Sequence, residues 1–344
     1  MTDSKPAAER LGLDPMRALE LKEVSSTDQL LRQMGNTAFT GRQLGAAAEV
    51  MEEMIRDDAF VVLTLSGAMT MAGLGRLIIE MLERRWVNCV VSTGALVGHG
   101  LVEDLGMSHY KADPQITDDV YFANRLNRVY DTIEPEQNLD RLETKVRALF
   151  DQLAEARDEP IGSAELLDYL GEHIGDHGVL QVAHRLGVRI FIPAFTDCEL
   201  GLDFAVHREL RCRERQPALA YDGFRDLEQF RALCQQQVAE GRKLGIFTIG
   251  GGVPRNWAQQ VGPYADIRAL RLGDPLKAPM RFGFGVRICP DPVHYGHLSG
   301  CTYSEGVTWG KFVPPASGGR YAEVLLDATV AWPLLAQAMI ERGL

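Results

Sequence analysis

The chain has 344 residues, of which 46% are hydrophobic and 24% charged, as in folded globular proteins and unlike disordered ones. Its formal net charge of −11 disfavours nucleic acid as the main partner, because nucleic-acid backbones are themselves negatively charged. No apolar stretch is long enough to span a bilayer, and the opening residues MTDSKPAAERLG lack the apolar region of a signal peptide. We therefore expect a cytoplasmic protein that binds neither nucleic acid nor membrane.

Residues 1–40 are polar and weakly periodic, and we expect them to form an N-terminal arm. Residues 41–344 are expected to form a single α/β domain, in which apolar runs alternate with amphipathic helical segments. The predicted strands are 59–65, 87–91, 188–192, 244–249, 282–288 and 322–328. The main predicted helices are 41–57, 72–85, 177–187, 226–243 and 333–344.

This alternation predicts a doubly wound, mostly parallel sheet. Nearly continuous apolar strands suit a sheet that helices cover on both faces, and helices between strands favour right-handed crossovers. Residues 107–162 break the pattern because they are polar and acidic. We interpret this segment as an insertion at the rim of the sheet, with helices of its own.

Small residues follow four of the predicted strands, at the edge where doubly wound sheets bind ligands. Such residues let a ligand approach the backbone, although glycine and serine also simply make turns. Four such loops together favour a dinucleotide or a phosphate ligand. Neither GxGxxG nor the P-loop motif is present, so we expect a less common mode of binding. The residues of interest in these loops are Ser66, Ala68, Thr93, Gly94, Ala95, Asp197, Gly251 and Gly252.

The segment 294–312 is rich in glycine and aromatic residues and lies between two apolar strands. Its Lys311 stands between Trp309-Gly310 and Phe312. A lysine that aromatic neighbours desolvate has a lowered pKa, and its neutral amine can attack an imine or carbonyl carbon. A surface lysine is the simpler interpretation of these residues alone. His294 and His297 lack a third ligand at suitable spacing, so no metal site is predicted.

The run Glu305-Gly306-Val307-Thr308-Trp309-Gly310-Lys311 resembles the E-A-V-S-W-G-K signature of deoxyhypusine synthases. Four other segments are similar to that family in the same order, namely residues 92–95, 193–201, 250–253 and 326–328, and the similarity extends from about residue 41 to the end. The resemblance implies a Rossmann-like, NAD-binding α/β fold. It also implies a homotetramer with active sites between subunits.

The family removes a 4-aminobutyl group from spermidine, holds it as an imine on a lysine, and passes it to an acceptor amine. By this resemblance Lys311 would be the catalytic nucleophile, Trp309 would line the polyamine chain, and Glu305 would bind an ammonium group. His99 and Asn256, which stand at or near substrate-binding positions of the family, are further candidates. The resemblance assigns to the NAD site Thr93, Gly94, Ala95, Asp197, Asp327 and Ala328.

The chain departs from the family pattern at several acids that would bind the substrate. Gly98, Gly100, Leu202 and Leu298 stand where family members carry carboxylates. We therefore expect an NAD-dependent aminobutyl transferase with a small acceptor amine, such as putrescine in homospermidine synthases. Two alternatives stay open: a true deoxyhypusine synthase, which modifies a lysine of a translation factor, and a catalytically silent sensor that binds NAD or a polyamine.

Overall fold

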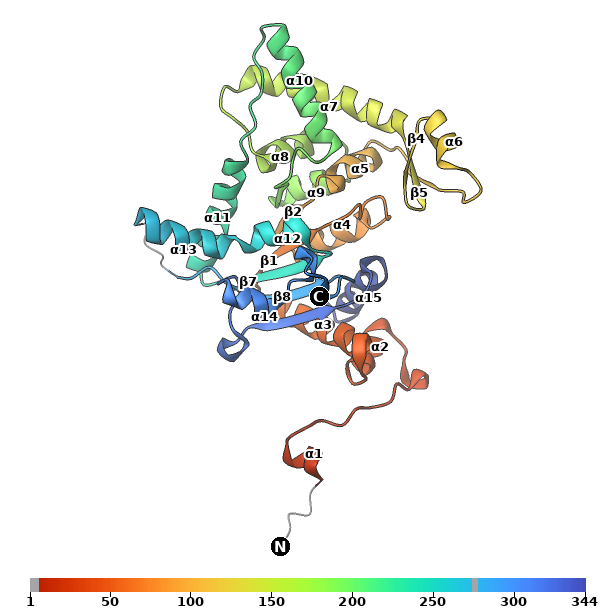
Figure 1. Cartoon of the computed structure of the whole chain (residues 1–344), viewed down its shortest axis with the longest axis vertical. Coiled ribbons are helices and arrows are strands. Elements are labelled where there is room, and N and C mark those ends of the chain that lie inside the picture. The colour runs from red at the N-terminus through yellow and green to blue at the C-terminus, as the bar shows by residue number, and fades with distance from the viewer. Residues whose placement is uncertain (1–5, 274–277) are drawn as a thin grey trace.

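The computed structural model describes residues 6–273 and 278–344, and its centre is a six-stranded sheet with all strands parallel (Figure 1). The strand order is β6-β2-β1-β7-β8-β9, so the chain builds outward from β1, first on one side and then on the other. The mixed α/β fold with a parallel sheet is thereby confirmed. The strands are β1 (Phe60–Leu65), β2 (Cys89–Ser92), β6 (Arg189–Phe191), β7 (Leu244–Ile249), β8 (Phe282–Ile288) and β9 (Arg320–Val324).

The apolar composition of the strands explains why both faces of the sheet are covered. All six residues of β1 are buried, and successive side chains enter different cores. Val61, Leu63 and Leu65 join one core, whereas Phe60 and Val62 join the other. Because neither face could meet water without exposing apolar side chains, helices must pack on both.

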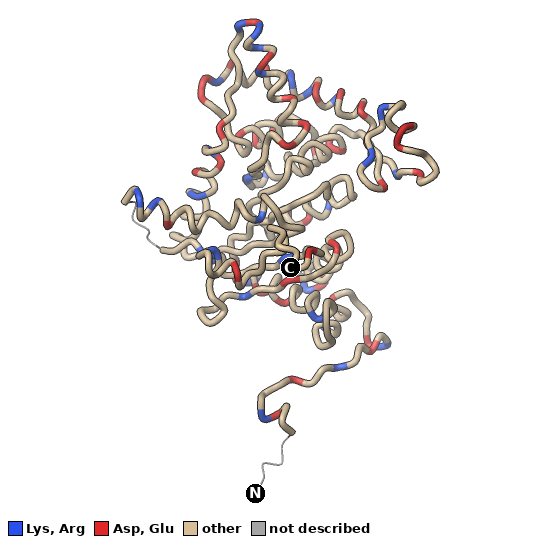
Figure 2. Tube along the Cα trace, in the orientation of Figure 1, with Lys and Arg blue, Asp and Glu red and all other residues tan. Residues whose placement is uncertain are grey.

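The first core lies between the sheet and the helices α3 (Phe39–Arg56), α4 (Gly75–Glu83), α5 (Ala95–Asp104), α9 (Val179–Leu186) and α15 (Ala328–Glu341). The second core lies under the helices α11 (Gly223–Ala239), α12 (Gly252–Gln259), α13 (Val261–Leu272) and α14 (Tyr303–Thr308). Helices α7 (Glu136–Ala156), α8 (Ser163–His173) and α10 (Glu199–Arg213) extend the first core away from the sheet. Acidic and basic residues are interleaved along α7 and α10 (Figure 2).

The segment predicted as a rim insertion contains a second sheet that sequence reasoning missed. Strands β3 (Tyr110–Lys111), β4 (Leu126–Val129) and β5 (Thr132–Pro135) pair antiparallel in the order β3-β5-β4, beside α6 (Asp118–Ala123). The strands are short, and three of the four residues of β4 are exposed. They therefore carry no apolar run by which a sequence pattern could reveal them.

The N-terminal arm is shorter than the predicted 1–40. Helix α2 (Thr27–Gly35), which follows α1 (Ala7–Arg10) and η1 (Leu21–Glu23), packs on α3 and α15, and its Leu31 is completely buried. A Cβ on Gly45 of α3 would lie 2.4 Å from Gly35 Cα, so the two helices touch through their backbones. The arm prediction failed for residues 27–35 because the contact uses few apolar side chains, mainly Leu31 and Met34, together with a glycine and the Asp28–Arg342 ion pair.

The end of the chain also differs from prediction. Strand β9 ends at Val324, the last residue in register with β8, rather than at residue 328. Helix α15 begins at Ala328 rather than at 333, because Asp327 caps it by accepting a hydrogen bond from the Thr329 amide at 2.9 Å. Pro333 therefore lies inside the helix and does not begin it. Among the described residues, no helix is both long and apolar enough to cross a membrane.

Candidate active site

The backbone around Lys311 is held by glycines and by β8. Thr302 caps α14 by accepting from the Glu305 amide at 3.1 Å, and the helix ends at a left-handed Gly310 with φ of 67°. The Lys311 amide then donates to Gly306 O, and the Lys311 carbonyl accepts from the Phe282 amide, both at 3.0 Å. The lysine is thus fixed between α14 and the first residue of β8.

The side chain of Lys311 is buried and has a neutral partner. The residue is 7% exposed, and its Nζ donates to Asn256 Oδ1 at 2.9 Å. Burial lowers the pKa of Lys311, and the nearby Arg255 cation lowers it further, against the opposing influence of Cys301 and Glu305. These surroundings favour the neutral, nucleophilic amine.

Lys311 opens into a cavity of about 280 Å³ between α12 and the segment that contains η2 (Val293–Tyr295), η3 (Leu298–Gly300) and α14. The structure brings together here four of the residues that sequence reasoning selected, from two distant parts of the chain. The cavity is lined by Asn256, Gln260, Val293, Gly296, His297, Leu298, Cys301, Glu305, Trp309 and Lys311. It therefore offers a nucleophile, one carboxylate and one aromatic face.

Two buried arginines that sequence reasoning missed support this cavity. Arg255 is 2% exposed, donates to Cys301 O at 2.6 Å and lies 5.3 Å from the centre of the Tyr303 ring. Arg287 donates to Ser299 O and to Glu323 at 2.7 Å. Both arginines therefore fix the backbone of η3 and of Cys301, which follows it. The one sequence signal that could have revealed them is Arg287 itself, a charged residue within the otherwise apolar run of β8.

The loops after β1 and β7 meet beside this region. Ser66 Oγ donates to Gly251 O, and a Cβ on Gly251 would lie 2.5 Å from Ser299 Cα. Gly252 has a positive φ of 63° and begins α12, the helix that carries Asn256. Ala68 lies in the loop after β1, half-buried. Several predicted cofactor residues are thus neighbours of the lysine cavity.

The loops after β2 and β6 form a second meeting point. A Cβ on Gly94 would lie 2.2 Å from the Cys198 side chain, so only glycine fits at the start of α5. Thr93 lies beside it with a buried Oγ1 that has no hydrogen-bond partner in the described chain. Ala95 is the first residue of α5, and the exposed Asp197 directly precedes Cys198.

Three predicted site residues have other surroundings. Asp327 caps α15, whose first residue Ala328 is buried. His99 points from α5 toward Glu134 of β5 and does not line the Lys311 cavity of its own chain, so the structure does not support it as a contact there. The resemblance placed His99 by its position along the chain, but the side chain faces the rim sheet.

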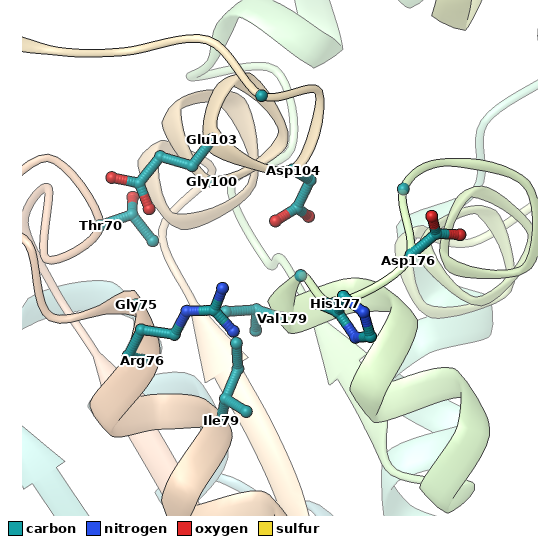
Figure 3. Close-up of a pocket in the computed structure, with 13 residues that line it drawn as sticks. Thr70, Gly75, Arg76, Ile79, Gly100, Glu103, Asp104, Asp176, His177 and Val179 are labelled. Carbon is teal, nitrogen blue, oxygen red and sulfur yellow. The ribbon is translucent and has the colours of Figure 1, made fainter.

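A separate cavity of about 300 Å³ lies between α4, α5 and the start of α9 (Figure 3). Its charged and polar lining includes Arg76, Glu103, Asp104 and His177. No predicted site residue lines this cavity. Burial raises the pKa of Asp104 to about 7, with help from the Glu103 charge. A Cβ on Gly178 would overlap the Asp104 carboxylate, so this acid is pressed against the chain that leads into α9.

The structure thus defines an α/β protein with small-residue loops at the ends of parallel strands and, beside them, a buried lysine with a lowered pKa. Comparison with known proteins agrees with this class. The sequence profile described as "Deoxyhypusine synthase" matches residues 29–339. The chain therefore belongs to the deoxyhypusine synthase family. Members of this family are NAD-dependent transferases of the aminobutyl group, and the chain is an enzyme of this class.

Individual relatives are similar over nearly their whole length. "Probable deoxyhypusine synthase 1" of Archaeoglobus fulgidus is 31% identical, over 94% of this chain and 97% of the relative. "Probable deoxyhypusine synthase 2" of Methanosarcina acetivorans is 30% identical, over 92% and 87%. A solved structure entitled "Crystal Structure of a putative deoxyhypusine synthase from Entamoeba histolytica" has a TM-score of 0.57 and 16% identity, and covers 94% of this chain and 96% of that one. This last likeness concerns the fold alone.

Proposed function

We propose that this chain transfers the 4-aminobutyl group of a polyamine such as spermidine, through an imine on Lys311, to a small acceptor amine. The observation that carries the proposal is the burial of Lys311 with Asn256 as its hydrogen-bond partner. Burial lowers the pKa of this amine and so favours its neutral form, and only this form attacks carbon. A lysine that merely bound an anion or solvent would not need such surroundings.

The reaction at Lys311 begins when the Nζ lone pair attacks the imine carbon of the oxidised donor. The C–N bond to the three-carbon amine then breaks, that amine leaves as 1,3-diaminopropane, and the aminobutyl group stays as an imine on Nζ. An acceptor amine attacks the same carbon and releases Lys311 in its neutral form. Asn256 Oδ1 accepts a hydrogen bond from Nζ and orients its lone pair. Covering of the cavity by a second subunit would protect the imine from water.

The loops that converge near Lys311 would hold NAD, which when bound would supply the hydride acceptor for oxidation of the donor and the hydride for reduction of the final imine. Glycine is required at Gly94 and Gly251, where a Cβ would collide with Cys198 and Ser299, so these loops pack closely against neighbouring segments at the ends of the strands. Thr93 Oγ1 is buried and, within the described residues, unsatisfied. We assign the NAD site to a Rossmann-like crevice where the strand order reverses at β1 and β7. Its other residues are Ser66, Ala68, Ala95, Asp197, Gly252, Asp327 and Ala328.

The cavity supplies partial complementarity to a polyamine. Glu305 can pair with one ammonium group, and the Trp309 ring can lie against another cation or the methylene chain. Leu298 lines the same cavity where the family pattern has an acid, so the far end of the substrate meets an apolar wall. This favours a small acceptor amine, as in homospermidine synthases.

A subunit interface at this site would follow the family pattern of a homotetramer. Three apolar residues that line the cavity, Val293, Leu298 and Trp309, are between 48% and 66% exposed. A rim of this kind is typical of a surface that a second protein covers. Its burial between subunits would also exclude water from Lys311.

The proposal is tested by incubating the enzyme with NAD, spermidine labelled in its aminobutyl part, and either putrescine or the hypusine-bearing translation factor. We expect 1,3-diaminopropane and label in a putrescine-derived product. Label in the translation factor would make the chain a true deoxyhypusine synthase. Borohydride trapping should fix label on Lys311, and a Lys311→Arg variant is the control. If neither diamine nor trapped label is formed, the sensor alternative holds.

A further inference from the structure

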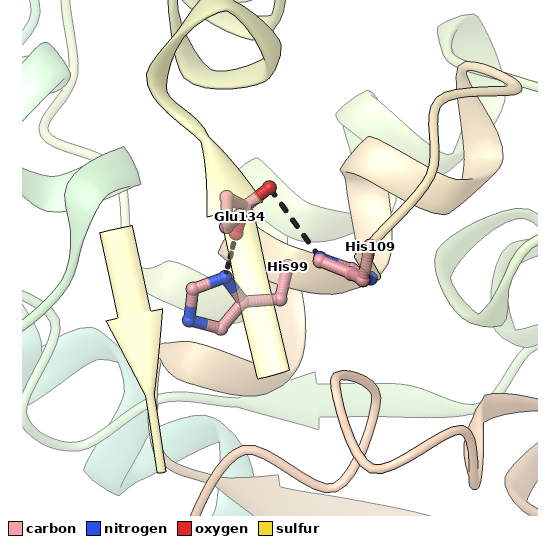
Figure 4. A group of neighbouring side chains, drawn as sticks. All are labelled: His99, His109 and Glu134. Carbon is pink, nitrogen blue, oxygen red and sulfur yellow. Dashed lines mark hydrogen bonds and ion pairs between the residues drawn. The ribbon is translucent and has the colours of Figure 1, made fainter. Parts of the chain in front are cut away.

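A cluster of three side chains lies outside the site described so far. His99 comes from α5, His109 from the connection between α5 and β3, and Glu134 from β5. Figure 4 shows the Glu134 carboxylate between the two imidazole rings. We propose that His99, His109 and Glu134 bind a divalent transition-metal ion, with Zn²⁺ as the ion that suits them best.

The geometry suits a common metal ion. One donor atom from each side chain lies within 4.8 Å of the others. His99 Nδ1 contacts Glu134 Oε2, and His109 Nε2 lies 3.4 Å from Glu134 Oε1. Zinc binds imidazole nitrogen and carboxylate oxygen at about 2.0–2.2 Å, so small side-chain rotations would place all three donors around one ion.

The burial of the donors is what points to a ligand. The His109 side chain is 8% exposed and Glu134 is 1% exposed. In the part of the chain that the structure describes, both ring nitrogens of His109 and Oε1 of Glu134 form no hydrogen bond of normal geometry and have only ion-pair contacts at 3.4–3.5 Å. Such long contacts satisfy buried polar atoms only in part, and an atom left fully unsatisfied costs about 1–3 kcal/mol. A bound cation would use their lone pairs directly.

Glu103 has the position of an outer partner. Its Oε1 lies 3.5 Å from His109 Nδ1, whereas the other ring nitrogen, Nε2, contacts Glu134 Oε1. Metal-bound histidines commonly direct their second ring nitrogen to a carboxylate, which fixes the tautomer and orients the ring. Two nitrogens and one carboxylate oxygen favour zinc over calcium or magnesium, which prefer all-oxygen sites.

The ion would join the rim sheet to the main domain. Helix α5 begins at Ala95, directly after Gly94, and carries His99 in its second turn, whereas β5 is the central strand of the antiparallel sheet. A metal bridge between them would hold α5 and thereby the loop at Gly94. We assign the ion a structural part, because the cluster shares no residue with the lining of the Lys311 cavity.

The competing explanation is a buried ion pair without metal. Contact with Glu103 and then Glu134 raises the pKa of His109 to about 9. Burial alone would raise the pKa of Glu134, but His109 and His99 outweigh it and lower the value to about 2. A protonated His109 beside an ionised Glu134 would partly compensate the charges. The two explanations differ in metal content and in whether chelators affect stability.

The test uses the full-length protein with any affinity tag removed. It is stripped with a chelator, dialysed, reloaded with Zn²⁺ and measured for bound metal by mass spectrometry. We expect about one tight zinc per chain and a higher Tm with zinc than with chelator. Glu134→Gln and His109→Gln should lose both effects. His184→Gln, in which the lost ring faces a single Asp168 at 3.0 Å, is the matched control and should keep both.

Three results would overturn the proposal: no stoichiometric zinc in the wild type, a Tm that ignores zinc and chelator, or unchanged zinc binding in both variants. If the variants do not fold, the wild type decides alone. Cobalt-loaded protein should then show the visible absorption of a low-coordinate site with nitrogen ligands. A spectrum identical to that of free cobalt would count against the site.

Discussion

Lys311 and Glu134 are both almost excluded from water, at 7% and 1% exposure, yet their surroundings are opposite. Lys311 donates to the neutral amide of Asn256. Glu134 lies between two imidazole rings, which can be cations or can share a metal ion. The charge of Lys311 is thus only weakly compensated by its neighbours, whereas that of Glu134 has two imidazole partners.

The difference separates a reactive group from a structural one. Burial that the neighbours compensate only in part shifts the protonation equilibrium of Lys311 toward the neutral amine, which costs folding free energy but prepares a nucleophile. The compensated burial of Glu134 lowers its pKa and links three segments of chain. The sharpest experimental test is therefore to replace each residue and compare the effects on transfer activity and on the free energy of unfolding.

The largest effect is expected from removing the nucleophile. Lys311→Arg keeps a long basic side chain but cannot form the imine, so transfer should fall by about 10³-fold or more. NAD binding should persist, because the proposed cofactor loops are untouched. Steady-state release of 1,3-diaminopropane and calorimetric NAD binding measure the two properties. Appreciable transfer by the variant would show that Lys311 is not the covalent group.

The second effect concerns stability and addresses the comparison directly. Glu134→Leu should lower the free energy of unfolding by about 3 kcal/mol, because two buried rings lose their partner. Lys311→Met should change it by less than about 1 kcal/mol, since the lost amine was itself poorly solvated. Urea denaturation at neutral pH measures both. Equal losses in the two variants would contradict the distinction drawn between the sites.

A third, smaller effect should follow from giving Lys311 a charged partner. Asn256→Asp places a carboxylate beside the amine, favours the protonated form and raises the pKa of Lys311. The rate increases with pH as the amine loses its proton, so the acidic limb of the pH–rate profile should move to higher pH. At neutral pH transfer should fall by about tenfold. Asn256→Leu should move the limb the other way, and a shift of equal sign in both variants would refute this role.

The smallest effect concerns Glu165, a carboxylate that belongs to neither the Lys311 cavity nor the His99–His109–Glu134 cluster. Burial alone would raise the pKa of Glu165, but hydrogen bonds from Arg225 and the Gly162 amide lower it to about 2. Because the folded pKa lies below the unfolded one, this stabilisation is complete above about pH 4.5 and disappears as the pH falls toward 2. Arg225→Gln should cost about 1 kcal/mol at pH 7. Unfolding curves should converge with the wild type near pH 2.

The strands show how much of the fold the local sequence pattern can predict. The predicted ranges 244–249 and 282–288 match β7 and β8 in full, because central strands buried on both faces must be continuously apolar. The ends of β9 and α15 were misplaced, since register with β8 and the Asp327 cap set them. The rim sheet and helix α2 escaped prediction because their contacts use few apolar side chains.

The sequence by itself determined the family, the order of the main strands along the chain, and the identity of a lysine that could act as a nucleophile. Only the tertiary structure decided which residues surround that lysine, because Asn256 and Lys311 are 55 positions apart and meet through the packing of α12 and α14. It likewise decided that His99 faces His109 and Glu134, which are ten and 35 positions away. Burial and partnership, which set the pKa of an ionisable group, are properties of the folded chain.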